Sequence, residues 1–240
     1  MGASLHQRIN VRALMPMQTV ILHTPKGGSG KSTLARELAV AAASTLQVAL
    51  ADLDPQGTTS GWYQRRGAVS PVLVNMDPAK PTWHLVEAGV ELLVIDTPPG
   101  QPPYIGKLLA SADLVLVPVR PTPDDLLAAA PIASSLARHP AWAFVLSQVP
   151  PRTRLLAGAL RQLAALGRVA PVHFTFRADY PAAAISGQAA SEFTGKASEE
   201  ALGLWAYVQT ILRGSDAVTP NGKAGRPDRA QGHRTGSSSR

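Results

Sequence analysis

The chain has 240 residues, which is enough for one α/β domain with a sizeable core, and residues 17–213 are expected to form it. It contains no cysteine, which excludes disulfides and thiolate metal sites and fits a reducing compartment such as the cytoplasm. The formal net charge is +7 and the pI is about 10.1, a balance that favours polyanionic partners.

Residues 1–16 precede the first predicted strand as an N-terminal arm. The sequence leaves open whether this arm is disordered, a tag, or a misassigned start ahead of Met15 or Met17. Charged and polar residues interrupt its first 14 positions, so no secretory signal is expected, and no apolar run of the chain is long enough to span a bilayer. We therefore expect a cytoplasmic protein.

Apolar runs alternate with helical patterns along the rest of the chain. Near-continuous apolar runs such as Leu92–Ile95 and Leu114–Val117 are typical of strands buried on both faces. The predicted fold is α/β, a doubly wound and mostly parallel sheet with helices on both faces. Strands are expected at 18–23, 47–52, 91–96, 113–119 and 142–149, with weaker ones at 72–75 and 171–175. Helices are expected at 31–46, 57–66, 101–111, 123–138, 153–166, 179–187 and 197–213.

A glycine-rich stretch with two lysines lies between the first predicted strand and the first predicted helix. Strand, glycine-rich loop and helix, in this order, are the context that a phosphate-binding loop requires. Glycines let backbone N–H groups approach phosphate oxygens closely, and the helix adds the positive end of its dipole. We expect Lys31 to neutralise the β- and γ-phosphates and Ser32 to ligate Mg²⁺. The predicted nucleotide-binding residues of this loop are Gly27, Gly28, Ser29, Gly30, Lys31, Ser32 and Thr33.

The loop departs from the common pattern G-x-x-x-x-G-K-[ST], because Pro25 stands where the first glycine should be and Lys26 stands beside it. A lysine that opens the loop in this way resembles the deviant Walker A motif of the ParA/MinD ATPases. The resemblance implies a P-loop NTPase fold with ATP and Mg²⁺ as cofactors. It also implies an ATP-dependent homodimer in which Lys26 reaches the nucleotide of the other subunit, so that Lys26 and Lys31 both act in catalysis.

Two carboxylates, Asp52 and Asp54, follow the strand predicted at 47–52. Alternating positions at the end of a strand share one side, so both can face the same site. The structural alternative is an aspartate that begins a turn or caps the next helix. The string D-x-D-P-Q-G resembles the family's second acidic box. This resemblance implies that Asp54 orients the attacking water and that Asp52 supports Mg²⁺ through water.

A third acidic position, Asp96, closes the apolar run at 91–96. Together with the following Thr-Pro-Pro-Gly, it resembles a Walker B box of the same family. The resemblance implies that Asp96 holds Mg²⁺, directly or through a water molecule, and that Gly100 lets the loop approach the γ-phosphate.

Three prolines lie near the end of the strand predicted at 113–119, with Pro118 in its last residues and Pro121 and Pro123 after it. Thr122 as N-cap and Pro123 in a first helical turn are a plain structural interpretation. The stretch also resembles the P-x-x-P-[ST]-P-x-D segment of small ParA-type partition ATPases, which implies that these prolines line the adenine end of the nucleotide. The two interpretations are compatible.

The helix predicted at 153–166 carries a basic repeat. Arg154, Arg161 and Arg168 recur every seven residues, close to two helical turns, opposite a stripe that includes Leu156, Leu160 and Leu163. No acidic residue lies between Asp125 and Asp179, so these arginines lack the usual compensating charges. We expect them to contact DNA phosphates without base specificity, the alternative being a solvated face. The Gly- and Ser-rich residues 214–240 are expected to be a disordered basic tail.

The resemblance is closest to small ParA-type plasmid partition ATPases. It implies a slow, Mg²⁺-dependent ATPase of DNA segregation that binds nucleoid DNA in its ATP state and is stimulated by a ParB-like, centromere-binding partner. The first alternative is a positioning ATPase for a protein cargo, such as a chemoreceptor cluster or a microcompartment. The second is a nucleotide-regulated scaffold in conjugative DNA processing. A MinD-type membrane anchor is not expected, because the tail has no apolar face.

Overall fold

The computed structural model describes residues 17–80 and 82–216. Within them, six strands form one parallel sheet in the order β3-β2-β4-β1-β5-β6. The strands are β1 (Gln18–Leu22), β2 (Val48–Asp52), β3 (Val72–Val74), β4 (Leu92–Asp96), β5 (Leu114–Val119) and β6 (Trp142–Leu146). The helices are α1 (Lys31–Ala43), α2 (Thr58–Arg65), α3 (Trp83–Glu87), α4 (Ile105–Ala110), α5 (Pro123–Leu136), α6 (Leu155–Ala164), α7 (Asp179–Ile185) and α8 (Lys196–Asp216), with a short 3₁₀ turn, η2 (Ala190–Glu192).

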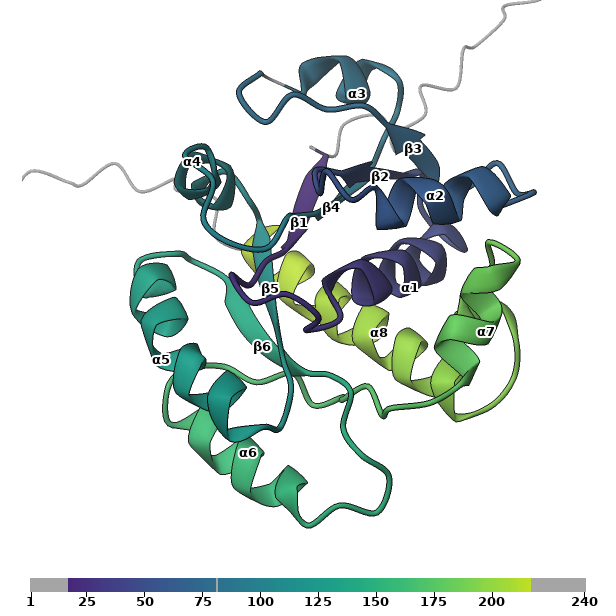
Figure 1. The fold of residues 1–240 in the computed structure, drawn as a ribbon. Coiled ribbons are helices and arrows are strands. Elements are labelled where there is room, and N and C mark those ends of the chain that lie inside the picture. Colours follow the sequence, from purple (N-terminus) through teal and green to yellow (C-terminus); the bar gives the residue numbers. More distant parts are fainter. Residues whose placement is uncertain (1–16, 81, 217–240) are drawn as a thin grey trace, which may run out of the picture.

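Helices cover both faces of the sheet, and each face has its own apolar core (Figure 1). Alternate strand residues point to opposite faces. In β4, Leu92 and Val94 therefore pack with α1, α2, α7 and α8, whereas Leu93 and Ile95 pack with α3, α4, α5 and α6. The same alternation directs Asp96, at the end of β4, to the α1 side. It likewise directs Asp52, at the end of β2, to that side, and the two residues are register partners.

The predicted fold class is confirmed, and the sheet is parallel throughout the described residues. Among the elements, α3 was not predicted, and the predicted strand at 171–175 is wrong, since Thr175 forms only an isolated bridge with Val149. The last helix runs to Asp216, three residues past the predicted domain boundary at 213. The arm at 1–16 and the tail from 217 onward lie outside the described residues.

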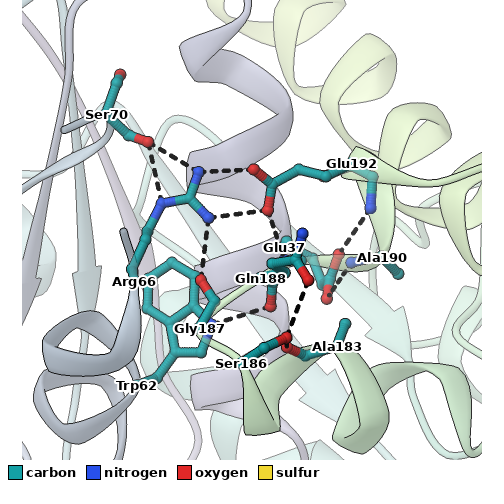
Figure 2. Close-up of polar contacts among 12 residues, drawn as sticks. Glu37, Trp62, Arg66, Ser70, Ala183, Ser186, Gly187, Gln188, Ala190 and Glu192 are labelled. Carbon is teal, nitrogen blue, oxygen red and sulfur yellow. Dashed lines mark hydrogen bonds and ion pairs between the residues drawn. The ribbon is translucent and has the colours of Figure 1, made fainter. Parts of the chain in front are cut away.

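A polar cluster fastens α2 to the segment before α8 (Figure 2). The Arg66 guanidinium, just past α2, donates to the carbonyl oxygens of Ser70 and Gly187 and forms an ion pair of 2.8 Å with Glu192. The fully buried Trp62 donates its indole N–H to the Gln188 carbonyl. Gly187 has a φ of 71°, and a Cβ there would lie 2.4 Å from the Arg66 nitrogen, so the close approach requires glycine. These contacts connect α2 and Arg66 to residues 187–192, which lie 121 to 126 positions later in the chain.

Candidate functional site

The glycine-rich loop at 26–33 lies beyond the carboxyl end of β1, where ligands of open parallel sheets bind. Gly28 and Gly30 have positive φ values of 71° and 94°, which place consecutive N–H groups around a concave turn. The loop after β6 holds this turn from the side. Ser147 donates its hydroxyl to the Ser29 carbonyl at 2.5 Å, and Gln148 donates its amide to the Gly28 carbonyl at 2.7 Å. The loop therefore has the geometry of an anion-binding nest.

Lys31, the first residue of α1, is folded back under the loop and is 6% exposed. Its ammonium donates to the carbonyl oxygens of Thr24 at 3.2 Å and Lys26 at 3.1 Å. Burial lowers the pKa of Lys31, and the nearby carboxylates of Asp96 and Asp54 partly oppose this shift. A buried cation that is held by two neutral carbonyls can be stabilised further by an anion in the loop.

Asp96 is fully buried, and one of its oxygens lacks a partner. Thr59 of α2 donates its hydroxyl to Oδ2 at 2.7 Å, whereas Oδ1 has no hydrogen-bond partner among the described residues. Burial raises the pKa of Asp96 to about 6, an effect that the neighbouring Thr59 and Ser32 hydroxyls reduce. A buried, unpartnered carboxylate oxygen next to a serine hydroxyl fits Mg²⁺, which accepts few protein ligands and keeps several waters. Asp96 and Ser32 are the residues that would hold the ion.

Asp52 has a structural role beside that site. Its Oδ2 accepts the Ser60 N–H in the first turn of α2 at 2.7 Å, and its Oδ1 accepts the Asp54 N–H at 3.1 Å. It thus caps α2, as the structural alternative proposed, while its position opposite Asp96 leaves it able to act on a metal through water. Asp54 lies in the turn beyond the strand, where Oδ1 accepts the Gln56 N–H at 3.0 Å, and it is partly exposed.

Lys26 does not project freely from the loop. It forms an ion pair with Asp125, which is 3% exposed and lies in the first turn of α5. Arg120 holds the same carboxylate with its Nε at 2.6 Å and its Nη2 at 3.1 Å. Burial alone would raise the pKa of Asp125, but the hydrogen bonds from Arg120 and Lys26 outweigh it and lower the pKa.

A pocket of about 470 Å³ opens from the end of the loop, along the first turn of α1. Its walls are Gly30, Thr33, Leu34, Ser147, Gln148 and the segment 174–178, with Tyr180 and Pro181. Pro118, Pro121 and Pro123 are not among its lining residues. Pro118 lies within β5, and the other two flank Thr122 at the start of α5, where the Thr122 hydroxyl accepts the Asp125 N–H at 3.4 Å. These positions agree with the structural interpretation, in which Thr122 is the N-cap and Pro123 lies in the first turn of α5.

The three arginines predicted to contact DNA are all exposed, but they are not on one regular helix. Arg154 immediately precedes α6, Arg161 lies in its last turn, and Arg168 lies past its end, near Tyr207 of α8. None of them forms an ion pair within residues 17–80 and 82–216. The predicted apolar stripe is only partly buried, since Leu155 and Leu160 are exposed.

Sequence reasoning missed several residues of this site: Thr59, Arg120, Asp125, Ser147, Gln148 and the segment 174–181. Of these, Arg120 and Asp125 lie in the P-x-x-P-[ST]-P-x-D segment, but no role in the site was predicted for them. The structure brings Asp125 to the glycine-rich loop because β1 and β5 are neighbours, so that the loops that follow them meet. His23 directly follows β1, and its Nδ1 donates a hydrogen bond to the Thr97 hydroxyl at 3.1 Å. Burial and then Lys31 lower the pKa of His23 to about 4, so it is neutral near pH 7.

Comparisons with known proteins match this geometry. A family model described as the CobQ/CobB/MinD/ParA nucleotide binding domain matches residues 20–208. A "Maintenance of carboxysome distribution protein A" from Gloeobacter kilaueensis is 38% identical over 108 residues, which cover 42% of this chain and only 48% of that relative. A protein of the same name from Halothiobacillus neapolitanus is 30% identical over 162 residues, 62% of this chain and 74% of that protein.

Solved structures show the same fold at low identity. The septum site-determining protein MinD from Pyrococcus horikoshii, complexed with Mg-ADP, has a TM-score of 0.67 and 14% identity, covering 82% of this chain and 97% of that one. A putative plasmid partition protein from Borrelia burgdorferi, bound to AMPPNP, has a TM-score of 0.63 and 14% identity, covering 83% and 100%.

Proposed function

Because this chain belongs to the CobQ/CobB/MinD/ParA nucleotide-binding domain family, we propose that it is a positioning ATPase that binds Mg²⁺ and ATP and dimerises around the nucleotide. The observation that carries this proposal is the buried Lys31 at the loop, near a buried Asp96 carboxylate oxygen that has no hydrogen-bond partner among residues 17–80 and 82–216. A triphosphate in the loop supplies the anion for Lys31, and Mg²⁺ bound to it supplies the partner for Asp96.

The remaining residues follow from this placement. Backbone N–H groups of residues 27–33 hold the phosphates, and Ser32 ligates Mg²⁺ beside Asp96. Asp54, partly exposed at the edge of the site, orients the water that attacks the γ-phosphate, while Asp52 assists Mg²⁺ through water. Hydrolysis is slow in the isolated protein, since a carboxylate that orients water supplies only part of the stabilisation that phosphoryl transfer requires.

Lys26 completes the site from the other subunit. In the monomer it is neutralised by Asp125, so the ATP-bound dimer requires this ion pair to open. Opening leaves Asp125 with its two hydrogen bonds from the Arg120 guanidinium and one from the Arg120 backbone N–H, and the buried carboxylate does not become unpaired. Asp125, held by Arg120, therefore binds the Lys26 side chain until the nucleotide of a second subunit is available.

The dimer binds DNA through exposed arginines, including Arg154, Arg161 and Arg168, and a cargo-bound partner stimulates hydrolysis and release. Two cargoes are candidates. The names of the two aligned relatives support a protein cargo such as a microcompartment. The partition of DNA, with a ParB-like partner, is the candidate that the sequence motifs favour. Deleting the gene in its own host distinguishes them, because loss of a replicon indicates DNA cargo and misplacement of a protein assembly indicates the other.

The nucleotide assignment is tested with Lys31→Ala. Removing the buried ammonium leaves the triphosphate without its main counter-charge, so the affinity for Mg-ATP in calorimetry should fall by at least about a hundredfold. Lys80→Ala is a matched control, since Lys80 is exposed and far from the loop in sequence. An unchanged affinity of the Lys31 variant for ATP would refute the assignment of the loop.

A further inference from the structure

The carboxylate of Glu200, on α8, is surrounded by donors from one short segment of the chain. Oε1 accepts the Thr175 hydroxyl at 2.8 Å and the Arg177 Nε and Nη2 groups at 3.1 Å each. Oε2 accepts the Thr175 N–H at 3.0 Å and the Tyr180 hydroxyl at 2.5 Å. Bonds to an ionised acceptor are stronger than neutral ones, so this carboxylate is the main polar anchor of the Arg177 and Tyr180 side chains.

That segment forms one wall of the pocket beside the loop. Thr175, Arg177 and Tyr180 all line the pocket, together with Phe174 and Phe176. The backbone of 174–176 is bound to the chain around β6, through Phe174 N–H to Leu146 O at 2.8 Å and Phe176 N–H to Val149 O at 2.8 Å. The Arg177 guanidinium, by contrast, donates to Glu200 alone in the described part of the chain.

The orientation of the pocket wall thus depends on Glu200. The Tyr180 ring stacks on Phe174 with centroids 5.4 Å apart, and its hydroxyl reaches Glu200 on the other side. Burial first, and then the Glu200 carboxylate, raise the pKa of Tyr180, so the phenol stays protonated and remains a donor. Loss of Glu200 leaves a cationic Arg177 without its acceptor beside the pocket, and it leaves the buried Tyr180 hydroxyl with only the Ala197 carbonyl at 3.5 Å.

The position of the pocket indicates which part of a ligand it holds. It begins at Gly30 and Thr33, where the phosphate nest ends, and its apolar lining of Leu34, Phe174, Phe176 and Pro181 suits a flat heterocycle. A nucleotide whose phosphates occupy the loop must therefore extend its nucleoside into this space.

We propose that Glu200 is a positioning residue for the nucleoside: its carboxylate on α8 fixes Thr175, Arg177 and Tyr180 as the wall against which the nucleoside binds. The inference rests on the proposed nucleotide function. Glu200 contributes to affinity through the nucleoside and not through the phosphates, so it makes the protein prefer a nucleoside triphosphate to inorganic tripolyphosphate.

The test compares wild-type protein, Glu200→Gln and Tyr180→Phe in calorimetric titrations with Mg-ATP, Mg-ADP and Mg-tripolyphosphate. For Glu200→Gln, the dissociation constants for ATP and ADP should both rise about tenfold, since charge-assisted bonds that hold the pocket wall are lost. The dissociation constant for tripolyphosphate should not change. Tyr180→Phe keeps the stacked ring and removes one bond, so it should show a smaller rise for both nucleotides.

Glu199→Gln is the matched control, because Glu199 is the adjacent residue of α8, is 64% exposed and pairs only with Lys196 in the described structure. In steady-state assays, Glu200→Gln should raise KM for ATP with kcat unchanged. Unchanged nucleotide affinity in Glu200→Gln, or an equal loss of ATP and tripolyphosphate binding, would overturn the inference while the proposed function stands. A wild-type protein that binds no ATP would overturn both.

Discussion

Asp125 is a buried carboxylate that holds two cations at once, Lys26 from the loop and Arg120 from the end of β5. The two partners are not equivalent. Arg120 is only five residues away and binds with two nitrogens, whereas Lys26 comes from a different loop and is 35% exposed. A single-point contact at a partly exposed lysine contributes little to stability, so Lys26 can leave at small cost. Lys26, which we propose to act across the dimer interface, is thus bound by Asp125 of its own subunit before the dimer forms.

Replacing this lysine separates binding from catalysis. Lys26→Ala should keep the affinity for Mg-ATP, because Lys31 and the loop N–H groups remain, and should lose hydrolysis by about two orders of magnitude. Colorimetric phosphate release at saturating ATP measures the rate, and calorimetry measures the affinity. Lys80→Ala again serves as control. A turnover rate equal to that of wild-type protein would contradict the cross-subunit role of Lys26.

For individual residues, the sequence predicted which ones lie together at the carboxyl ends of the strands, but not which side chains they contact. Lys31, Ser32, Asp52 and Asp96 follow from a simple rule, since the carboxyl ends of parallel strands share one edge. The hydrogen bond from Thr59 to Asp96 depends on the position that α2 takes after the preceding turn. Side-chain contacts of that kind are set by packing, and no local pattern encodes them.

Among the secondary-structure elements, α2 has contacts at both ends that link distant parts of the molecule. Near its start, Thr59 donates to Asp96 and Ser60 donates to Asp52. Near its end, Trp62 and Arg66 bind Gln188, Gly187 and Glu192 (Figure 2). Glu37 of α1 also binds residues 187–192, because its carboxylate accepts hydrogen bonds from the N–H groups of Ala190 at 3.1 Å and Ser191 at 3.4 Å. The helix α2 therefore connects Asp96 with residues 187–192 through side-chain contacts at its two ends.

Glu37 makes the stability of this contact depend on pH. Burial raises the pKa of Glu37 from 4.5 to about 7. A carboxyl whose pKa is higher in the folded state contributes stability that is full below the unfolded value and is lost as the pH rises through the folded value. Glu37→Gln has no ionisable group at this position. The free energy of unfolding of wild-type protein should therefore fall relative to that of Glu37→Gln as the pH rises from 4.5 to about 7.

Urea unfolding followed by circular dichroism, repeated across this pH range, measures the difference. Glu199→Gln is the control, because its carboxylate is exposed. A difference between wild-type protein and Glu37→Gln that stays constant over the range would mean that Glu37 ionises alike in the folded and unfolded chains.

Most strong elements could be predicted from the sequence, and so could the weaker strand at 72–75, which is β3, whereas other weak elements could not. The buried strands are continuous apolar runs, and only their ends differ from the prediction by a few residues. The short helix α3 carries too few residues to show a helical period. At 171–175, the apolar residues pack beside β6 without a continuous ladder of hydrogen bonds. In α6, Leu155 and Leu160 match the helical period and yet are exposed. The pattern indicates which face of the helix is apolar, but not how much of that face is covered by other elements.

At the scale of the whole molecule, all charged residues between Asp125 and Asp179 are basic, and Arg154, Arg161 and Arg168 among them are exposed. Arg154, Arg161 and Arg168 have no ion-pair partner in residues 17–80 and 82–216, and the stretch that contains them has no acidic residue. Replacing all three with Glu should abolish ATP-dependent retention on DNA at low salt, because phosphate contacts account for sequence-independent binding. Co-sedimentation with ATP, ADP or no nucleotide, across a salt series, measures it.

A charge-matched triple variant, with Lys80, Lys107 and Lys196 replaced by Glu, controls for net charge. It should retain DNA if the arginines form the contact surface. Retention that persists in the arginine variant would place the DNA contact elsewhere on the protein.

Within the described residues, no helix is both long enough and apolar enough to cross a bilayer. The molecule that results is an α/β domain with helices on both faces of the sheet (Figure 1), and the glycine-rich loop, Asp52, Asp96 and Lys26 lie at or beyond the carboxyl ends of the strands. We propose that a second copy of the chain binds at this end of the sheet and completes the site.

The central claim is that two subunits share two nucleotides, each receiving Lys26 from the opposite chain. Sedimentation velocity of the full chain with Mg²⁺ and a non-hydrolysable ATP analogue tests it most directly. We predict a dimer with the analogue and a monomer with ADP or without nucleotide. A chain that remains monomeric when saturated with the analogue would contradict the account.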